Sequence, residues 1–137
     1  MQKKFKRSFE EIAHIVDETE AFFSRSGIPS TLRTSVDLCI EELFVNMVTY
    51  NTESEQDILL ELRAIENGIE VGLTDFDVDR FDPTELQEVD VDAPLSERTP
   101  GGLGVYLVLK MVDSIHYEYH DRQSKITFQI RAENQDV

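Results

Sequence analysis

The chain has 137 residues, a length that suits one domain with a hydrophobic core of its own. Its 28 acidic residues outnumber its 13 lysines and arginines, so the formal net charge is −15. This charge argues against duplex DNA or an anionic membrane as a partner, because both attract basic surfaces. The single cysteine, Cys39, excludes an internal disulfide and a cysteine-rich zinc site. We therefore expect one cytoplasmic domain, residues 1–137, that binds neither nucleic acid nor membrane.

The first part of the chain predicts a weak strand followed by two helices. Residues 3–8 alternate weakly, and apolar residues then recur at helical spacing from Phe9 to Phe23. Gly27 predicts the end of that helix. A second helix is expected from about residue 31 to 50, since its apolar positions step by three and four. Cys39 belongs to this apolar set, so we expect a buried thiol rather than a nucleophile.

A hairpin and a long acidic segment follow the helices. Residues 57–63 and 69–74 alternate between apolar and polar side chains on either side of the turn signal Glu66-Asn67-Gly68. Residues 77–100 break the pattern and are rich in acidic residues and proline. Long loops in compact domains are often functional, so we expect a lid over this segment.

The last part of the chain predicts a third helix and a second hairpin. The helix begins at Gly101 and Gly102, and the strands cover residues 115–119 and 126–130. Helices thus come as a group and strands come in hairpins. This order predicts an α+β fold, a two-layer α/β sandwich whose mixed or antiparallel sheet carries helices on one face.

Glu42 and Asn46 are the first candidates for chemistry. They are four residues apart on the second predicted helix, so they share a face within an otherwise largely apolar run. Buried carboxylates and amides are costly without partners. In a functional interpretation, Asn46 offers an oxygen to a hard cation and Glu42 orients water or accepts a proton. In a structural interpretation, Glu42 is solvated and Asn46 bonds a neighbouring backbone group.

Two further candidates lie where strands and helices end or begin. Asp75 follows the strand at 69–74, where an acid can bind a ligand or simply cap a turn. The second is the run from Arg98 through Gly101, Gly102 and Gly104, which opens the third helix. Exposed amides at a helix N-terminus attract phosphate, and Arg98 adds positive charge. No Walker A or Rossmann spacing is present, and a plain helix-entry turn is the alternative.

The order of these three motifs resembles that of the GHKL ATPases. The motifs are Glu-x-x-x-Asn on a helix, an aspartate at a strand end, and Gly-Gly-Leu-Gly opening a helix after a lid. The segment from Gly101 to Asp113 further looks like that of the bacterial anti-sigma-factor serine kinases, and the resemblance covers essentially the whole chain. It implies a Bergerat-type ATP-binding fold with a mixed sheet, and ATP and Mg²⁺ as cofactors.

The resemblance also implies a role for each matching residue. Asn46 matches the magnesium-binding asparagine, Glu42 the glutamate that acts as general base toward the attacking hydroxyl, and Asp75 the aspartate that bonds the adenine amino group. The others match residues that enclose the phosphates or, for the arginine, aid phosphate binding or partner contact: Arg98, Gly101, Gly102 and Gly104.

The implied function is an ATP-binding, anti-sigma-factor-type regulator with serine kinase activity toward an antagonist (anti-anti-sigma) protein. It would bind a sigma factor or similar regulator, and it would form a homodimer. One departure favours an alternative: acids stand at Asp77 and Asp79, where the family's first glycine box has glycines. The alternative is a regulatory binding module of the same fold with weakened or lost ATP binding. A third possibility is an α+β domain in which the motifs occur by chance.

Overall fold

The computed structural model describes residues 1–85 and 102–133. In these residues, strands and α-helices follow in this order: β1 (Gln2–Phe5), α1 (Ile12–Ser26), α2 (Arg33–Tyr50), β2 (Ile58–Ile65), β3 (Gly68–Phe76), α3 (Gly102–Met111), β4 (Ser114–His120) and β5 (Gln123–Arg131). Short 3₁₀ turns are interspersed: Phe9–Glu11, Ser30–Leu32 and Pro83–Glu85. No helix within the described ranges is both long and apolar enough to cross a bilayer.

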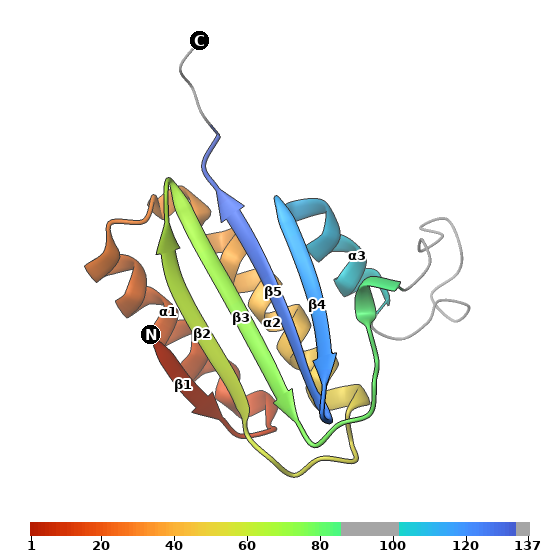
Figure 1. The fold of residues 1–137 in the computed structure, drawn as a ribbon. Helices are drawn as coiled ribbons and strands as arrows, with labels where there is room; N and C mark the ends of the chain where they lie inside the picture. The colour runs from red at the N-terminus through yellow and green to blue at the C-terminus, as the bar shows by residue number, and fades with distance from the viewer. Residues whose placement is uncertain (86–101, 134–137) are drawn as a thin grey trace.

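The strands form one sheet in the order β1-β2-β3-β5-β4, and the three α-helices lie behind one of its faces (Figure 1). This confirms the α+β, two-layer fold class. All four pairings among the described strands are antiparallel, whereas the resemblance implied a mixed sheet. Two of the pairings are tight hairpins, which are antiparallel by geometry. The chain then enters β4 at the edge of the sheet and returns as β5 beside β3.

The hydrophobic core lies between the sheet and the helices. Alternate residues of the three central strands point toward the helices and are buried: Ile58, Leu60, Leu62, Ile69, Val71, Leu73, Ile126, Phe128 and Ile130. Helix α2 covers them with a row that includes Val36, Leu43 and Phe44. Cys39 lies in the same row, fully buried, and burial raises the pKa of its thiol to about 11. The expected buried thiol is therefore confirmed.

Left-handed backbone conformations mark the end of α1 and the two hairpin turns. Gly27 adopts φ +67° and stops α1, as its position in the sequence predicted. Asn67 adopts φ +59° in the turn between β2 and β3. In the β4–β5 turn, Asp121 and Arg122 have φ values of +51° and +60°, the pattern of a type I′ turn. Because β5 pairs with β3, this second turn brings Arg122 beside the end of β3.

Candidate functional site

Asn46 is a buried polar residue on the core side of α2. Only 6% of its surface is exposed, and its Nδ2 has no hydrogen-bond partner among the residues that the structure describes. Buried side-chain amides nearly always find partners, because an unmade hydrogen bond costs about 1–3 kcal/mol. Among the described residues, therefore, the Asn46 amide nitrogen does not bond a neighbouring backbone group, which was the structural interpretation of this residue.

Glu42 lies one turn before Asn46 and faces the beginning of α3. A Cβ atom at Gly104 would collide with the Glu42 carboxylate and would lie 2.8 Å from its Cδ, so the absence of a side chain lets the two helices meet here. Burial raises the pKa of Glu42 above its ordinary value, and the charge of Glu41 adds to the effect. A carboxylate with a raised pKa is a stronger base than an ordinary glutamate.

Asp75 is fully buried at the end of β3; its Oδ2 accepts a hydrogen bond, and its Oδ1 lies in an ion pair but has no hydrogen-bond partner among the described residues. Asn51 Nδ2 donates a hydrogen bond to Asp75 Oδ2 at 2.6 Å, and the Arg7 guanidinium forms an ion pair with Asp75 Oδ1. Arg7 also donates to the Met47 carbonyl oxygen at 3.4 Å. Burial lowers the pKa of Arg7, and the charge of Glu53 opposes that shift. Asp75 is therefore the centre of a buried polar cluster that joins β3, α2 and the segment after β1.

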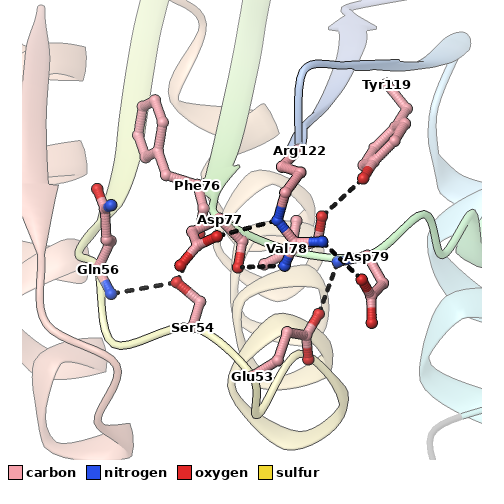
Figure 2. Close-up of polar contacts among 9 residues, drawn as sticks. All are labelled: Glu53, Ser54, Gln56, Phe76, Asp77, Val78, Asp79, Tyr119 and Arg122. Carbon is pink, nitrogen blue, oxygen red and sulfur yellow. Dashed lines mark hydrogen bonds and ion pairs between the residues drawn. The ribbon is translucent and has the colours of Figure 1, made fainter.

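The turn after β3 holds two acids where the resembling family has glycines. Asp77 adopts φ +58°, the left-handed conformation that glycine adopts most easily. Arg122 Nε donates to Asp77 Oδ1 at 3.0 Å, and its Nη1 donates to Asp79 Oδ1 at 2.8 Å (Figure 2). These two contacts raise the pKa of Arg122. One arginine from the β4–β5 turn thus forms ion pairs with both acids and offsets part of their negative charge.

Further hydrogen bonds fix this turn on both sides (Figure 2). The Val78 N–H donates to the Arg122 carbonyl oxygen at 3.0 Å, and the Tyr119 hydroxyl donates to the Val78 carbonyl oxygen at 2.8 Å. The Asp79 N–H donates to Glu53 Oε1 at 2.8 Å. The turn is therefore attached to the β4–β5 hairpin and to the segment that follows α2.

The residues that the sequence singled out fall into three groups. Glu42 and Gly104 come together between α2 and α3, with Asn46 one turn along α2, and Gly102 begins α3. Asp75 has Arg7 and Asn51 as its polar partners rather than any other predicted residue. Arg98, Gly101 and most of the predicted lid at 77–100 lie outside the described residues.

Three residues of this site were missed from the sequence: Arg7, Asn51 and Arg122. Arg7 belongs to a short basic stretch, and nothing in that stretch indicates that its side chain pairs with a distant carboxylate. Asn51 lies just beyond the predicted end of a helix, where asparagine is ordinary. Arg122 lies in a predicted turn, but its contact with Asp77 depends on β5 pairing with β3. That pairing was the missing information.

The comparisons with known proteins agree with this fold. A family model described as the histidine kinase-like ATPase domain matches residues 5–130. No curated protein sequence matches the chain significantly. The chain is similar in fold to a Mycobacterium tuberculosis structure of the RsbU and RsbW domains of Rv1364c, with a TM-score of 0.67 and 8% identity over 96% of this chain. It spans 32% of that longer chain.

A second solved structure with a similar fold is the Acinetobacter baumannii histidine kinase AdeS. Its TM-score is 0.53, with 14% identity over 98% of this chain and 68% of that one. At such low identities, both similarities concern the fold alone. The family match, by contrast, spans nearly the whole chain and implies ATP as the ligand class, usually with Mg²⁺. The unpartnered Asn46 N–H is a donor of the kind that a phosphate oxygen accepts, whereas Mg²⁺ would need the oxygen of the same amide. The chain belongs to the histidine kinase-like ATPase domain family.

Proposed function

We propose that this protein is an ATP-binding regulator of the anti-sigma-factor type with serine kinase activity toward an antagonist protein. One observation carries the proposal: a buried Asn46 amide without a partner lies one turn from Glu42, whose carboxylate meets the start of α3 at Gly104. The family assignment and the order of the sequence motifs support the same conclusion.

Each residue has one task in this proposal. The Asn46 side-chain oxygen holds Mg²⁺, and its amide nitrogen is free to donate to a phosphate oxygen. Glu42 accepts the proton of the attacking serine hydroxyl. Asp75 accepts from the adenine amino group. Backbone amides at Gly102 and Gly104, at the start of α3, would bind the phosphates, and the resemblance implies the same role for Gly101 and Arg98, which lie outside the described residues. Bound Mg²⁺–ATP supplies the phosphoryl group, whose transfer depends mainly on positioning and charge neutralisation.

The proposed partners follow from the resemblance and from charge. They are a sigma factor or similar regulator, the antagonist protein that is phosphorylated, and a second copy of this chain in a homodimer, all in the cytoplasm. A net charge of −15 favours a basic face on the heterologous partners, because complementary charge speeds encounter and excludes wrong partners.

A second candidate function is a regulatory binding module of the same fold that uses no ATP. The observation that favours it is the state of Asp75, whose carboxylate is fully buried and already engaged by Arg7 and Asn51. Asp77 and Asp79 add negative charge nearby, although Arg122 offsets it. In this candidate, the protein regulates its partner by contact alone.

Calorimetric titration with ATP, with and without Mg²⁺, decides between these functions. We expect Mg²⁺-dependent binding by the wild type and by Glu42→Gln, and no Mg²⁺-dependent binding by Asn46→Ala. Removing the Asn46 amide should change the free energy of unfolding by no more than about 1 kcal/mol, because that nitrogen makes no hydrogen bond in the described structure. A much larger loss would mean that Asn46 supports the fold rather than a ligand.

The kinase step is tested in the same variants by ADP formation with the antagonist protein present, because its serine hydroxyl is the phosphoryl acceptor. Glu42→Gln should bind ATP and form no ADP, whereas Glu41→Gln, which alters the exposed neighbouring carboxylate, should keep wild-type activity. Equal ADP formation by Glu42→Gln and the wild type would reject Glu42 as the base. No binding of millimolar ATP by the wild type would favour the binding module, and capture of a protein partner would then be the next experiment.

A further inference from the structure

We propose that Arg122 is a positioning residue for nucleotide binding, because it pairs with two acids at the border of the candidate site and so limits their repulsion of a nucleotide's phosphates. The inference rests on the proposed function, in which Mg²⁺–ATP is the ligand. The two acids are Asp77 and Asp79, in the turn after β3. Arg122 comes from the β4–β5 turn, a part of the sheet that carries none of the predicted site residues.

The residues after β3 pass the end of α2 and then approach α3. We call residues 77–85 the border segment. Within it, Phe81 stacks on Tyr50 with ring centroids 5.8 Å apart. Tyr50 lies one helical turn beyond Asn46, a rise of about 6 Å along α2. The border segment ends in the short turn Pro83–Glu85, which contacts α3 (Figure 1). It therefore lies beside both helices of the candidate site.

Three carboxylates gather where the border segment begins (Figure 2). The side chains of Asp77 and Asp79 are 55% and 77% exposed, and Glu53, in the segment after α2, accepts the Asp79 N–H through Oε1 at 2.8 Å. Arg122 donates to both aspartate side chains, and its Nη2 also donates to the Asp77 carbonyl oxygen at 3.4 Å. One guanidinium thus offsets two carboxylates that would otherwise repel an approaching anion.

The effect of this pairing depends on the charge of the ligand. Repulsion between like charges is weak in water, so it becomes substantial only for a ligand that carries several negative charges. Mg²⁺–ATP carries more negative charge than Mg²⁺–ADP and has the same base and ribose. Without Arg122, the binding of Mg²⁺–ATP should therefore weaken more than the binding of Mg²⁺–ADP. If Arg122 only supported the fold, its loss would weaken the binding of both nucleotides equally.

The test compares dissociation constants for ATP and ADP in the presence of Mg²⁺, measured by calorimetry on the full chain. Arg122→Met should bind ATP about tenfold more weakly than the wild type, and ADP about threefold more weakly. Arg122→Lys keeps the positive charge and should stay within about threefold of the wild type for both nucleotides. Arg63→Met is the matched control and should bind both nucleotides like the wild type. It removes an exposed arginine that pairs with Glu70, far from the turn after β3.

A combined variant separates the charge of Arg122 from any anchoring role. Asp77→Asn together with Asp79→Asn removes both negative charges at nearly the same side-chain shape, so adding Arg122→Met to this pair should cost no ATP affinity. The melting temperature of Arg122→Met should fall by no more than about 5 °C, because exposed ion pairs contribute little to stability. A larger fall would mean that Arg122 supports the fold instead.

The outcomes separate this inference from the proposed function. If Arg122→Met bound ATP as tightly as the wild type, the inference would be overturned and the proposed function would stand. The same holds if the affinity lost in Arg122→Met stayed lost after both acids were neutralised. Failure of the wild type to bind either nucleotide overturns the inference and the proposed ATP-binding function together.

Discussion

Asn46 and Asp75 each bury one polar atom that has no hydrogen-bond partner among the described residues. In Asn46 it is the amide nitrogen; in Asp75 it is Oδ1, which lies in an ion pair with Arg7, while Oδ2 accepts a hydrogen bond from Asn51. Burying a polar group without a partner costs free energy that the fold must supply elsewhere. Such a cost is common at sites that bind ligands, and it supports the proposal that both residues contact the nucleotide.

Glu42 gives a prediction about pH and stability. Its pKa in the folded protein is raised, so the protonated form is favoured by folding. The wild type should therefore lose stability relative to Glu42→Gln as the pH rises from about 4.3, the ordinary glutamate value, through the raised value. Melting temperatures measured between about pH 4 and pH 7 check this. If the wild type instead gained stability relative to Glu42→Gln with rising pH, the direction of the pKa shift would be wrong.

At the scale of single residues, the sequence predicted the buried groups better than their partners. Helical spacing was enough to place Cys39 on the core side of α2, where it is buried, and to place Asn46 beside the apolar positions, where it is buried as well. The ion pair between Arg7 and Asp75 was not predictable in the same way. It joins the segment after β1 to the end of β3, which lie at the same end of the sheet but are far apart in the sequence, and its formation depends on how α2 and that segment meet β3.

The turn after β3 gives a prediction at the scale of an element. Asp77 is left-handed, so Asp77→Ala keeps a strained Cβ and loses the contact with Arg122. Asp77→Gly loses the same contact but removes the strain. We expect Asp77→Ala to be less stable than Asp77→Gly by about 1 kcal/mol, measured by denaturant unfolding.

Asp79→Ala is the matched control for this comparison. Asp79 pairs with the same arginine but has no positive φ, so its substitution removes an exposed ion pair alone. Such pairs contribute about 0.2–1 kcal/mol. If Asp77→Ala and Asp77→Gly were equally stable, the left-handed conformation of Asp77 would not limit this turn. Asp77→Gly is also the variant in which nucleotide affinity should rise if acids at this turn weaken binding.

Elements were predicted more fully than their arrangement. Periodicity and turn residues placed the helices, both hairpins and the stop at Gly27, because these depend on neighbouring residues. The position of β5 between β3 and β4 was not predicted, and the sequence left open whether the sheet is mixed or antiparallel. Alternation indicates which face of a strand is buried but does not identify the strand beside it.

The whole molecule gives a prediction about salt. With a net charge of −15, the folded chain repels itself, and dissolved ions screen that repulsion. The melting temperature should rise between about 0.01 M and 0.1 M salt, a range over which the screening length falls from about 30 Å to about 10 Å. The rise should diminish in acid, as the carboxylates become protonated. A melting temperature that falls with salt would show that ion pairs such as Arg33–Asp37 outweigh the general repulsion.

The β4–β5 turn has a consequence for engineering this protein. Type I′ turns prefer Asn-Gly, yet Asp121 and Arg122 occupy the two left-handed positions here. Replacing them with Asn-Gly would be a standard way to make the hairpin more stable. The same change would remove the Arg122 side chain, which donates hydrogen bonds to Asp77 and Asp79 in the turn after β3. Thermostabilisation should therefore be sought elsewhere in the chain, because a better turn would release the segment that borders the site.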